Sequence, residues 1–300
     1  SKALKKTAAQ LALHSAHRFC MLARVGSAGR RRVLASRYAA LAVLWPLFSV
    51  LVLAALILLC WITAVAGGKC DREQGGHVET AYVTEISLTT ETPPQSYVWT
   101  LGVAVTWICF LCPATWLLHE AFLWTLRRHW AEALVLALSE LLLVVAMLFL
   151  VGLAAVTNRG TFLEPSFELE DGHAIHQRMA DLFFMCFYIH GGVFLVLQGI
   201  HWKELIWLER RSLVIKALLM VFMSLSVAGV LPSLFLELPA LSPTEEIREL
   251  NRRGLTQRLA VLGIMLYVGT YSLELAALRK RLKEEGKSQA VASELRGSED

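Results

Sequence analysis

Six long apolar blocks constrain what this 300-residue chain can fold into. The first contains the run LFSVLVLAALILLCWITAVA, which has no charged residue. Roughly 20 helical residues cross a hydrocarbon layer of about 30 Å. The blocks lie at about 38–66, 97–118, 131–156, 180–199, 213–235 and 257–278. Unpaired backbone groups are costly in lipid, and the blocks do not alternate as barrel strands do, so each block predicts a transmembrane helix.

The composition agrees, because 56% of the residues are hydrophobic and only 18% are charged. Ordinary soluble domains are less apolar and more charged. We therefore predict an all-α polytopic membrane bundle in three parts. These are a basic amphipathic N-terminal tail at 1–37, a six-helix transmembrane domain at 38–280 and a charged C-terminal tail at 281–300.

The distribution of positive charge predicts the orientation of the chain, because Lys and Arg near helix ends stay on the cytoplasmic or matrix side. Basic residues fill the N-terminal tail, the second-to-third and fourth-to-fifth connections, and the start of the C-terminal tail. The other three connections hold most of the acids. Both termini are thus expected on one side, with the 86–96 loop opposite. The net charge of +4 is explained by topology, and we expect no nucleic-acid partner.

The N-terminal tail has a second pattern, since Leu4, Leu11 and Leu22 fall on one helical face opposite Lys2 and Lys6. A basic amphipathic helix on an anionic membrane surface fits this pattern, and so does a mitochondrial targeting segment. A disordered positive tail that only fixes topology is the plain alternative. We expect the tail to bind a partner or membrane surface through a run of three arginines: Arg30, Arg31 and Arg32.

The loop ISLTTETPPQS, residues 86–96, precedes the second block. Its paired prolines, Pro93 and Pro94, favour an extended backbone outside a helix, and Ser96 is positioned to cap the second span. A rigid lid and helix start explains most of the loop, and a lid over a lipid head-group site is the functional alternative. For the latter the candidate residues include Ser87 and Thr89.

Ionisable residues inside the blocks are further candidates, because they tend to face a cavity or a partner. Glu140 and His190 lie near the middle of consecutive blocks and are expected to meet, either as a proton relay or head-group site or as a buried hydrogen bond that fixes packing. Glu274 lies near the end of the sixth block, where a Lys or Arg is expected to reach it. His176 completes the lipid-site candidates.

Chemistry of other kinds is not favoured by the sequence. Cys109 and Cys112 form a C-x-x-C pair, but inside a lipid-spanning helix they lack the access that a redox or zinc site needs. His173 and His176 lie among acids without a third His at a fixed spacing, so we expect no metal. No motif assembles a nucleophile, a base and an oxyanion site, so we expect a non-catalytic protein without a cofactor.

The 86–96 loop resembles the outer loop of the DRAM-like family of six-helix membrane proteins, named for damage-regulated autophagy modulators and including GPI-anchor lipid remodelling factors. That loop runs approximately I-S-D-T-G-x-x-P-P-E-S. The matching residues are Ile86, Ser87, Thr89, Pro93, Pro94 and Ser96, and the departures are Leu88, Thr90 and Gln95. The resemblance extends to His176, Ala180 and Phe184 and to Thr270, Tyr271 and Glu274, whereas Gln257 and Arg258 stand where the family often has an acid and a tryptophan.

Two function classes remain open. The resemblance implies a protein of an endomembrane such as the Golgi or lysosome, with membrane lipids as its partners, that acts in lipid handling or homeostasis. The basic tail and its presequence-like composition instead favour a structural subunit of a large membrane complex, possibly in the mitochondrial inner membrane, with other membrane protein subunits as partners. Knowing the organelle would separate the two.

Overall fold

A computed structural model describes residues 42–68, 71–74, 77–80, 85–90, 94–126, 130–157, 160–161, 172–236, 245–281 and 283–284. Residues 42–277 form one compact unit; a second groups 1–41 with 278–300. The proposed amphipathic N-terminal helix, Arg30 to Arg32 included, lies outside the described residues. The division into 1–37, 38–280 and 281–300 therefore stays a prediction.

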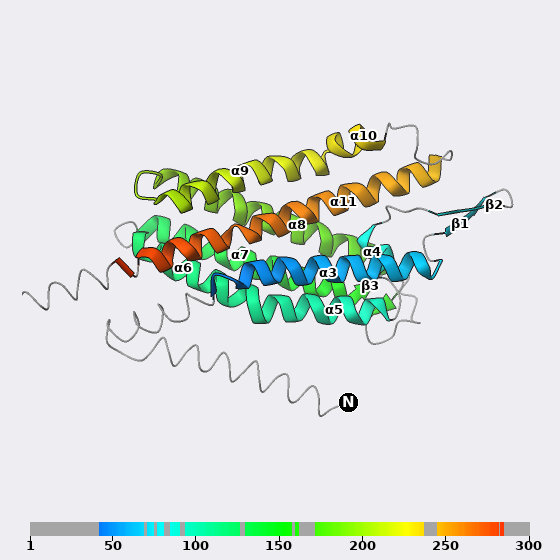
Figure 1. The fold of residues 1–300 in the computed structure, drawn as a ribbon, viewed down its shortest axis with the longest axis horizontal. Helices are drawn as coiled ribbons and strands as arrows, with labels where there is room; N and C mark the ends of the chain where they lie inside the picture. The colour runs from blue at the N-terminus through cyan, green and yellow to red at the C-terminus, as the bar shows by residue number, and fades with distance from the viewer. Residues whose placement is uncertain are drawn as a thin grey trace, which may run out of the picture. The chain divides into compact units, whose positions relative to one another are not determined.

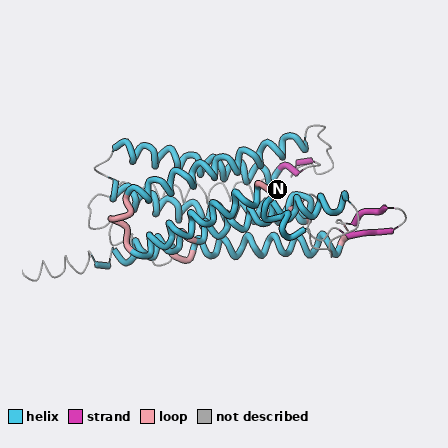
Figure 2. The backbone as a smooth tube through the Cα atoms, turned by 90° about the horizontal axis from the view of Figure 1, so that it is seen from above, coloured by secondary structure: helices cyan, strands magenta, loops and turns pink. Residues whose placement is uncertain are grey.

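The unit at 42–277 is predominantly helical, as predicted (Figure 1). Its helices are α3 (Trp45–Ala66), α4 (Ile86–Thr89), α5 (Gln95–Thr106), α6 (Cys112–Leu126), α7 (Trp130–Ala155), α8 (Gly172–Ile200), α9 (Trp207–Val227), α10 (Val230–Leu236) and α11 (Glu245–Gly269). Two short antiparallel hairpins join them: β1 (Asp71–Gln74) with β2 (His77–Thr80), and β3 (Val156–Thr157) with β4 (Gly160–Thr161). Figure 2 shows that the long helices run lengthwise, with the strands near one end.

Within the described parts of the chain, five helices are long and apolar enough to cross a membrane. They cover Trp45–Ala66, Gln95–His119, Trp130–Ala155, Ile175–Ile200 and Ile247–Arg281. Each corresponds to a predicted block, and the last is much longer than the 257–278 block, with a break in the helix at Thr270. The chain is therefore a multi-pass membrane protein.

The predicted block at 213–235 is not among those five helices. It is divided between α9 and α10, because α9 ends at Val227 and Gly229 adopts a φ of 76°. Only glycine takes that conformation readily, so the helix stops there. In addition α9 carries three cations, Arg210, Arg211 and Lys216, which lower its mean hydropathy.

The second span is one helix with a wide turn inside it. Between α5 and α6, residues Trp107–Leu111 form a π-helix, η1, and the Cys112 N–H donates to the carbonyl of Trp107. Pro113 follows directly and has no N–H to donate to the preceding turn, which favours such a local rearrangement. The prediction that Ser96 caps this span was wrong: the helix begins at Gln95 after Pro94, with no side-chain cap.

Helix packing brings distant segments together. α7 lies along α8, α9 lies along α11, and α3 contacts both α5 and α11. Glycines allow the closest approaches, as is common between membrane helices. A Cβ on Gly263 of α11 would lie 2.2 Å from Cγ of Met223 on α9, and a Cβ on Gly102 would lie 2.2 Å from Cδ1 of Leu56 on α3. The contact between α9 and α11 brings α9 against the helix that leads to the polar residues after Thr270.

Candidate functional site

A cluster of polar side chains lies inside the bundle, where four helical segments meet. We call it the interior cluster. Its members come from α7, α8, α9 and the helical residues that follow Thr270: Ser139, His190, Gln198, Ser212, Lys216, Tyr271 and Glu274. All seven side chains are buried. Polar groups withdrawn from both water and lipid need partners, and the cluster supplies most of them internally.

Glu274 and Lys216 form the charged part of the interior cluster. The Lys216 Nζ lies 2.5 Å from Glu274 Oε1, and the two side chains are 0% and 4% exposed. The same oxygen accepts hydrogen bonds from Ser212 Oγ and Gln198 Nε2, each at 2.9 Å. One carboxylate oxygen thus gathers donors from α8 and α9. This geometry satisfies the expectation that a cation reaches Glu274.

Aromatic rings surround the Lys216 ammonium on its other sides. Its Nζ lies 4.4 Å from the ring centre of Tyr271, 4.5 Å from that of Phe194 and 5.3 Å from that of Tyr267. Ring faces attract cations, most strongly where water is excluded. The rings also pack on one another, with Tyr267 and Tyr271 edge to face at 5.9 Å. Lys216 is therefore held as a buried charge by one acid and three rings.

His190 forms the second part of the cluster and bonds to two helices at once. Its Nδ1 lies 3.0 Å from the Ser139 carbonyl oxygen and 3.0 Å from Ser139 Oγ, and its Nε2 lies 3.1 Å from the Tyr271 hydroxyl. A neutral ring with the proton on Nδ1 satisfies both sides, because Nδ1–H donates to the carbonyl and Nε2 accepts from Tyr271. His190 thereby ties α7 to the segment that carries Glu274.

Glu140, the expected partner of His190, lies beside this network. It is half-buried on α7 next to Ser139, and it interacts electrostatically with Lys216 and Glu274. Both ring nitrogens of His190 are occupied by Ser139 and Tyr271. The packing of α7 on α8 was anticipated, whereas the pairing of Glu140 with His190 itself stays a prediction.

The loop candidates lie at the bundle end that carries α4 (Figure 1). Thr89 is buried and its hydroxyl donates to the Ile86 carbonyl at 2.8 Å. The Ile86 N–H donates to Gln257 Oε1 at 2.5 Å, which anchors the loop to α11. Gln257 stands where the resembled family often has an acid, and its amide oxygen can accept the same bond. Pro94 is exposed immediately before α5.

The other candidates are placed as follows. His176 is buried near the start of α8, and its Nδ1 lies 2.6 Å from the Val156 carbonyl oxygen. The backbone of Ser87 lies in α4, whereas Pro93 is outside the described residues. The part of the chain that the structure describes contains no group of three metal-ligating side chains. A head-group role of these residues remains a proposal.

Sequence reasoning missed Lys216, Gln198, Ser212 and Ser139. Lys216 carried a signal, since it is a charge within an apolar block and such residues usually face the bundle interior. The serines and the glutamine carried none, because small polar residues are ordinary in membrane helices.

The chain matches a protein-family model. The description of that family is Frag1/DRAM/Sfk1/Cwh43P N-terminal domain, and the match covers residues 42–236. The matched segment includes α3 to α10 and most of the interior cluster, but not α11 or Glu274. Comparisons with curated proteins and with solved structures find no significant match.

Proposed function

Since the chain belongs to the Frag1/DRAM/Sfk1/Cwh43P family, we propose that it is a non-catalytic membrane protein that acts in membrane lipid handling or homeostasis. The match agrees with the DRAM-like resemblance of the 86–96 loop. Its multi-pass character follows from the family and the apolar helices. The role in lipid handling goes beyond this membrane assignment and is our proposal.

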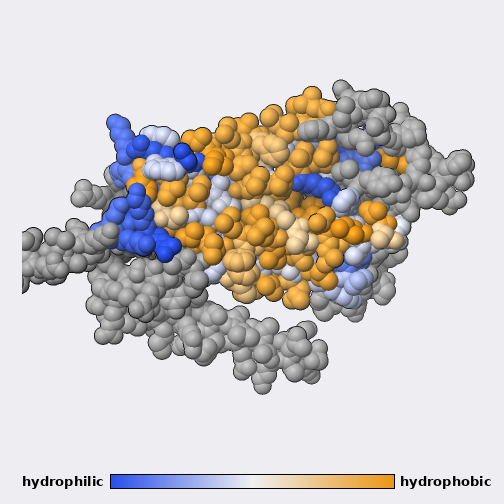
Figure 3. Space-filling view, in the orientation of Figure 1, coloured by the Kyte–Doolittle hydropathy of each residue, from blue (hydrophilic) through white to orange (hydrophobic). Residues whose placement is uncertain are grey.

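The single observation that carries this proposal is the contrast between the inside and outside of the bundle. The buried charges Lys216 and Glu274 contact one another and lie out of reach of a substrate. The outside of the helices is apolar over much of the visible face (Figure 3). Examples from four spans are Leu51, Leu101, Leu148 and Val196, all more than half exposed. Such a molecule meets its environment through lipid contacts.

We also propose that α9 and α10 together form a sixth span, so that both termini share the cytoplasmic or matrix side. The supporting observation is that Lys216 faces the interior cluster, and its charge is therefore withheld from lipid. To test this, cysteines replace Lys203, before α9, and Arg248, near the start of α11, in separate variants that lack native cysteines. A membrane-impermeant maleimide should label the two positions from opposite sides of sealed vesicles. Labelling from the same side contradicts the topology.

An endomembrane such as the Golgi or lysosome is the location that the family resemblance supports. The alternative of a structural subunit in the mitochondrial inner membrane depends on residues 1–37, which lie outside the described residues. Imaging of a C-terminally tagged full chain against organelle markers discriminates between them.

The function itself is tested by lipid analysis of cells with and without the chain. Removing it should change the lipid composition of its resident membrane, and re-expression of the wild-type chain should restore that composition. In parallel, purified chain incubated with labelled membrane lipids should convert none of them. An unchanged lipid composition after removal contradicts the lipid role, and conversion by the purified chain contradicts the non-catalytic part.

A further inference from the structure

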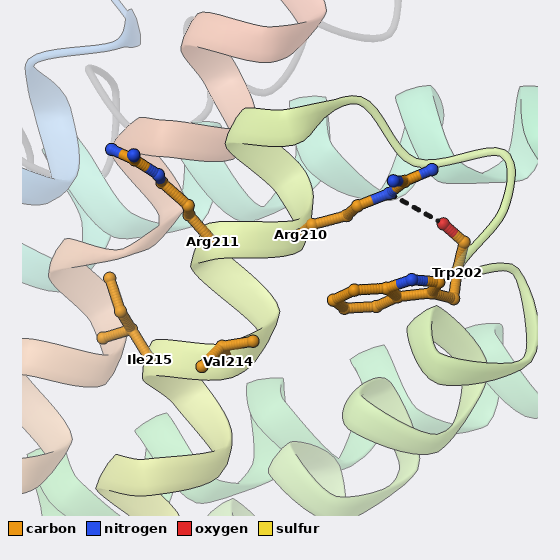
Figure 4. A pocket seen from close by; sticks show the side chains of 5 residues that line it. All are labelled: Trp202, Arg210, Arg211, Val214 and Ile215. Atoms are coloured by element: carbon orange, nitrogen blue, oxygen red, sulfur yellow. Dashed lines mark hydrogen bonds between the residues drawn. The ribbon is translucent and has the colours of Figure 1, made fainter.

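The turn between α8 and α9 forms a shallow groove of about 280 Å³. We call it the basic groove, and its lining residues are Trp202, Arg210, Arg211, Val214 and Ile215. Figure 4 shows that Arg210 reaches back toward Trp202, while Arg211 projects on the other side of α9. Val214 and Ile215 lie one turn further along the helix. The groove is separate from the interior cluster and from the 86–96 loop.

The two arginines are held in place without losing their charge. Arg210 Nε donates to the Trp202 carbonyl at 3.1 Å and Nη2 donates to the Lys203 carbonyl at 3.2 Å, and its guanidinium lies 5.5 Å from the Trp202 ring centre. The Arg211 guanidinium lies 3.7 Å from the ring centre of Trp207. Carbonyls and rings orient a guanidinium but do not neutralise it.

Nearby acids have other partners. Glu204 lies 3.5 Å from His201, and Glu209 Oε2 accepts the Ile206 N–H at 2.8 Å. Within the residues that the structure describes, neither Arg210 nor Arg211 pairs with a carboxylate. Lys203 is exposed in the same turn and adds a third positive charge. The two guanidiniums are thus left without a carboxylate partner in the described part of the chain, and the turn as a whole keeps an excess of positive charge.

The surface around the groove changes from polar at the turn to apolar along α9, as a phospholipid changes from its head group to its acyl chains. Trp202 and Trp207, 40% and 53% exposed, flank the turn at the helix ends, the depth that aromatic rings prefer at a membrane interface. Val214 and Ile215 follow at one helical turn of depth, about 5 Å toward the apolar middle of α9. The exposed lining of the groove is apolar and the two guanidiniums stand at its edges, an arrangement that suits the first part of an acyl chain below a charged head group.

We propose that the basic groove binds the phosphate of an anionic phospholipid, with Arg211 as its ligand, Arg210 adding positive charge from the other side of α9, and Val214 and Ile215 against the acyl chain. Guanidinium groups bind phosphate oxygens through paired charge-assisted hydrogen bonds. Basic pockets beside membrane helices recognise anionic head groups in the same way. The groove is too small for a whole phospholipid, so the remaining acyl chain lies along the outer surface of α9. This inference rests on the proposed function and names the lipid class.

The test uses the full chain reconstituted in phosphatidylcholine bilayers with trace spin-labelled lipids. Paramagnetic resonance measures the fraction of each labelled lipid that the protein immobilises. We expect wild type to prefer labelled phosphatidic acid over labelled phosphatidylcholine. The double variant Arg210→Gln with Arg211→Gln should lower that preference by about fivefold for each arginine, the usual contribution of one basic group at an anionic lipid surface.

Two further variants make the result specific. Arg248→Gln with Arg253→Gln removes two arginines from α11 and should leave the preference unchanged, which controls for net charge. Ile215→Trp keeps both groove arginines but fills the apolar floor, and it should also lower the preference. Thermal unfolding of each variant in detergent verifies that it is folded. If the groove variants keep the wild-type preference, or the control pair loses it equally, the proposal is overturned.

Free phosphate provides the last arm. Millimolar inorganic phosphate should leave the preference for phosphatidic acid largely intact, because the acyl chain adds apolar contacts that the free ion lacks. Complete displacement by phosphate would assign the groove to a soluble anion instead and overturn the lipid proposal. Neither outcome depends on the cellular lipid analysis, so failure of the groove and failure of the proposed lipid role are distinguishable.

Discussion

The interior cluster and the basic groove lie on the same helix, α9, and each places a cation against aromatic rings. They differ in whether the cation has a carboxylate partner and in whether it is exposed. Lys216 has a carboxylate and no exposed surface, whereas Arg211 has a ring face, no carboxylate and an open side. A buried cation that is paired with an acid connects two helices and has no free side for an external ligand. An exposed cation without an acid is left to bind an external anion.

Breaking the interior pair should have the largest effect on stability. Glu274→Leu leaves the buried Lys216 ammonium without its acid, and removing one partner of a buried pair costs about 3–5 kcal/mol. The unfolding free energy, measured in a mild detergent, should fall by that amount. The double variant Glu274→Leu with Lys216→Met should recover most of the loss, because no unpaired charge remains. Glu249→Gln, an exposed acid on α11, is the control and should change little. If the Glu274→Leu protein is as stable as wild type, the interior pair does not stabilise the fold, and the proposed difference between the interior cluster and the basic groove is wrong.

Overpacking the contact between α9 and α11 should have the next largest effect on stability. Gly263→Ala places a Cβ against Met223, and overpacking typically costs about 1–3 kcal/mol. Gly192→Ala is the matched control, since its Cβ would meet nothing within 4 Å. The unfolding free energy should fall for the first variant only. Equal behaviour of the two variants would mean that α9 and α11 are not as close as described.

Loosening the neutral part of the cluster should matter less. Tyr271→Phe removes the hydroxyl that lies 3.1 Å from His190 Nε2. Hydrogen bonds between membrane helices contribute about 0.6 kcal/mol on average, so the unfolding free energy should fall by about that amount. His190→Gln disturbs the contacts to both Tyr271 and Ser139, so it should cost more than Tyr271→Phe. If Tyr271→Phe costs as much as Glu274→Leu, the charged and neutral parts of the cluster are not separable.

The smallest effect concerns pH and comes from His201, which pairs with Glu132. Burial by itself lowers the pKa of His201. The hydrogen bonds and negative charges of Glu132 and Glu204 raise it by more than burial lowers it, so the pKa lies above the usual 6.5. The bond from His201 Nε2 to Glu132 Oε2 is 2.6 Å. Below pH 6.5 the folded and unfolded chains both carry the proton, and the full stabilisation is present. As pH rises through the raised pKa, that stabilisation is lost.

We expect a loss of about 0.5 kcal/mol, measured as unfolding free energy from pH 5 to pH 9. Glu132→Gln should remove most of this pH dependence while leaving the interior cluster intact. An unchanged pH profile in that variant would show that another group is responsible.

Sequence was sufficient for the spans, because a block of apolar residues long enough to cross a membrane permits few alternatives. It was also sufficient to expect a cation near Glu274. The identity of that cation was not predictable, since Lys216 lies 58 positions away and α9 meets α11 only through packing. Ser139 was missed because it is uncharged, whereas the neighbouring Glu140 is charged and was chosen as the partner of His190. The bond that His190 makes requires only an acceptor oxygen, and the Ser139 carbonyl provides it.

The wide turn at Trp107–Leu111 sets the rotational phase of the second span. A π turn contains about one residue more than an α turn, and one residue in an α-helix is about 100° of rotation. Leu117 and Leu118 are buried after this offset, and Trp116 is exposed. Deleting a single residue from η1 would convert the wide turn into an ordinary α turn and leave α6 facing its present neighbours. Converting the wide turn to an α turn without a deletion would instead rotate α6 by about 100° relative to α5.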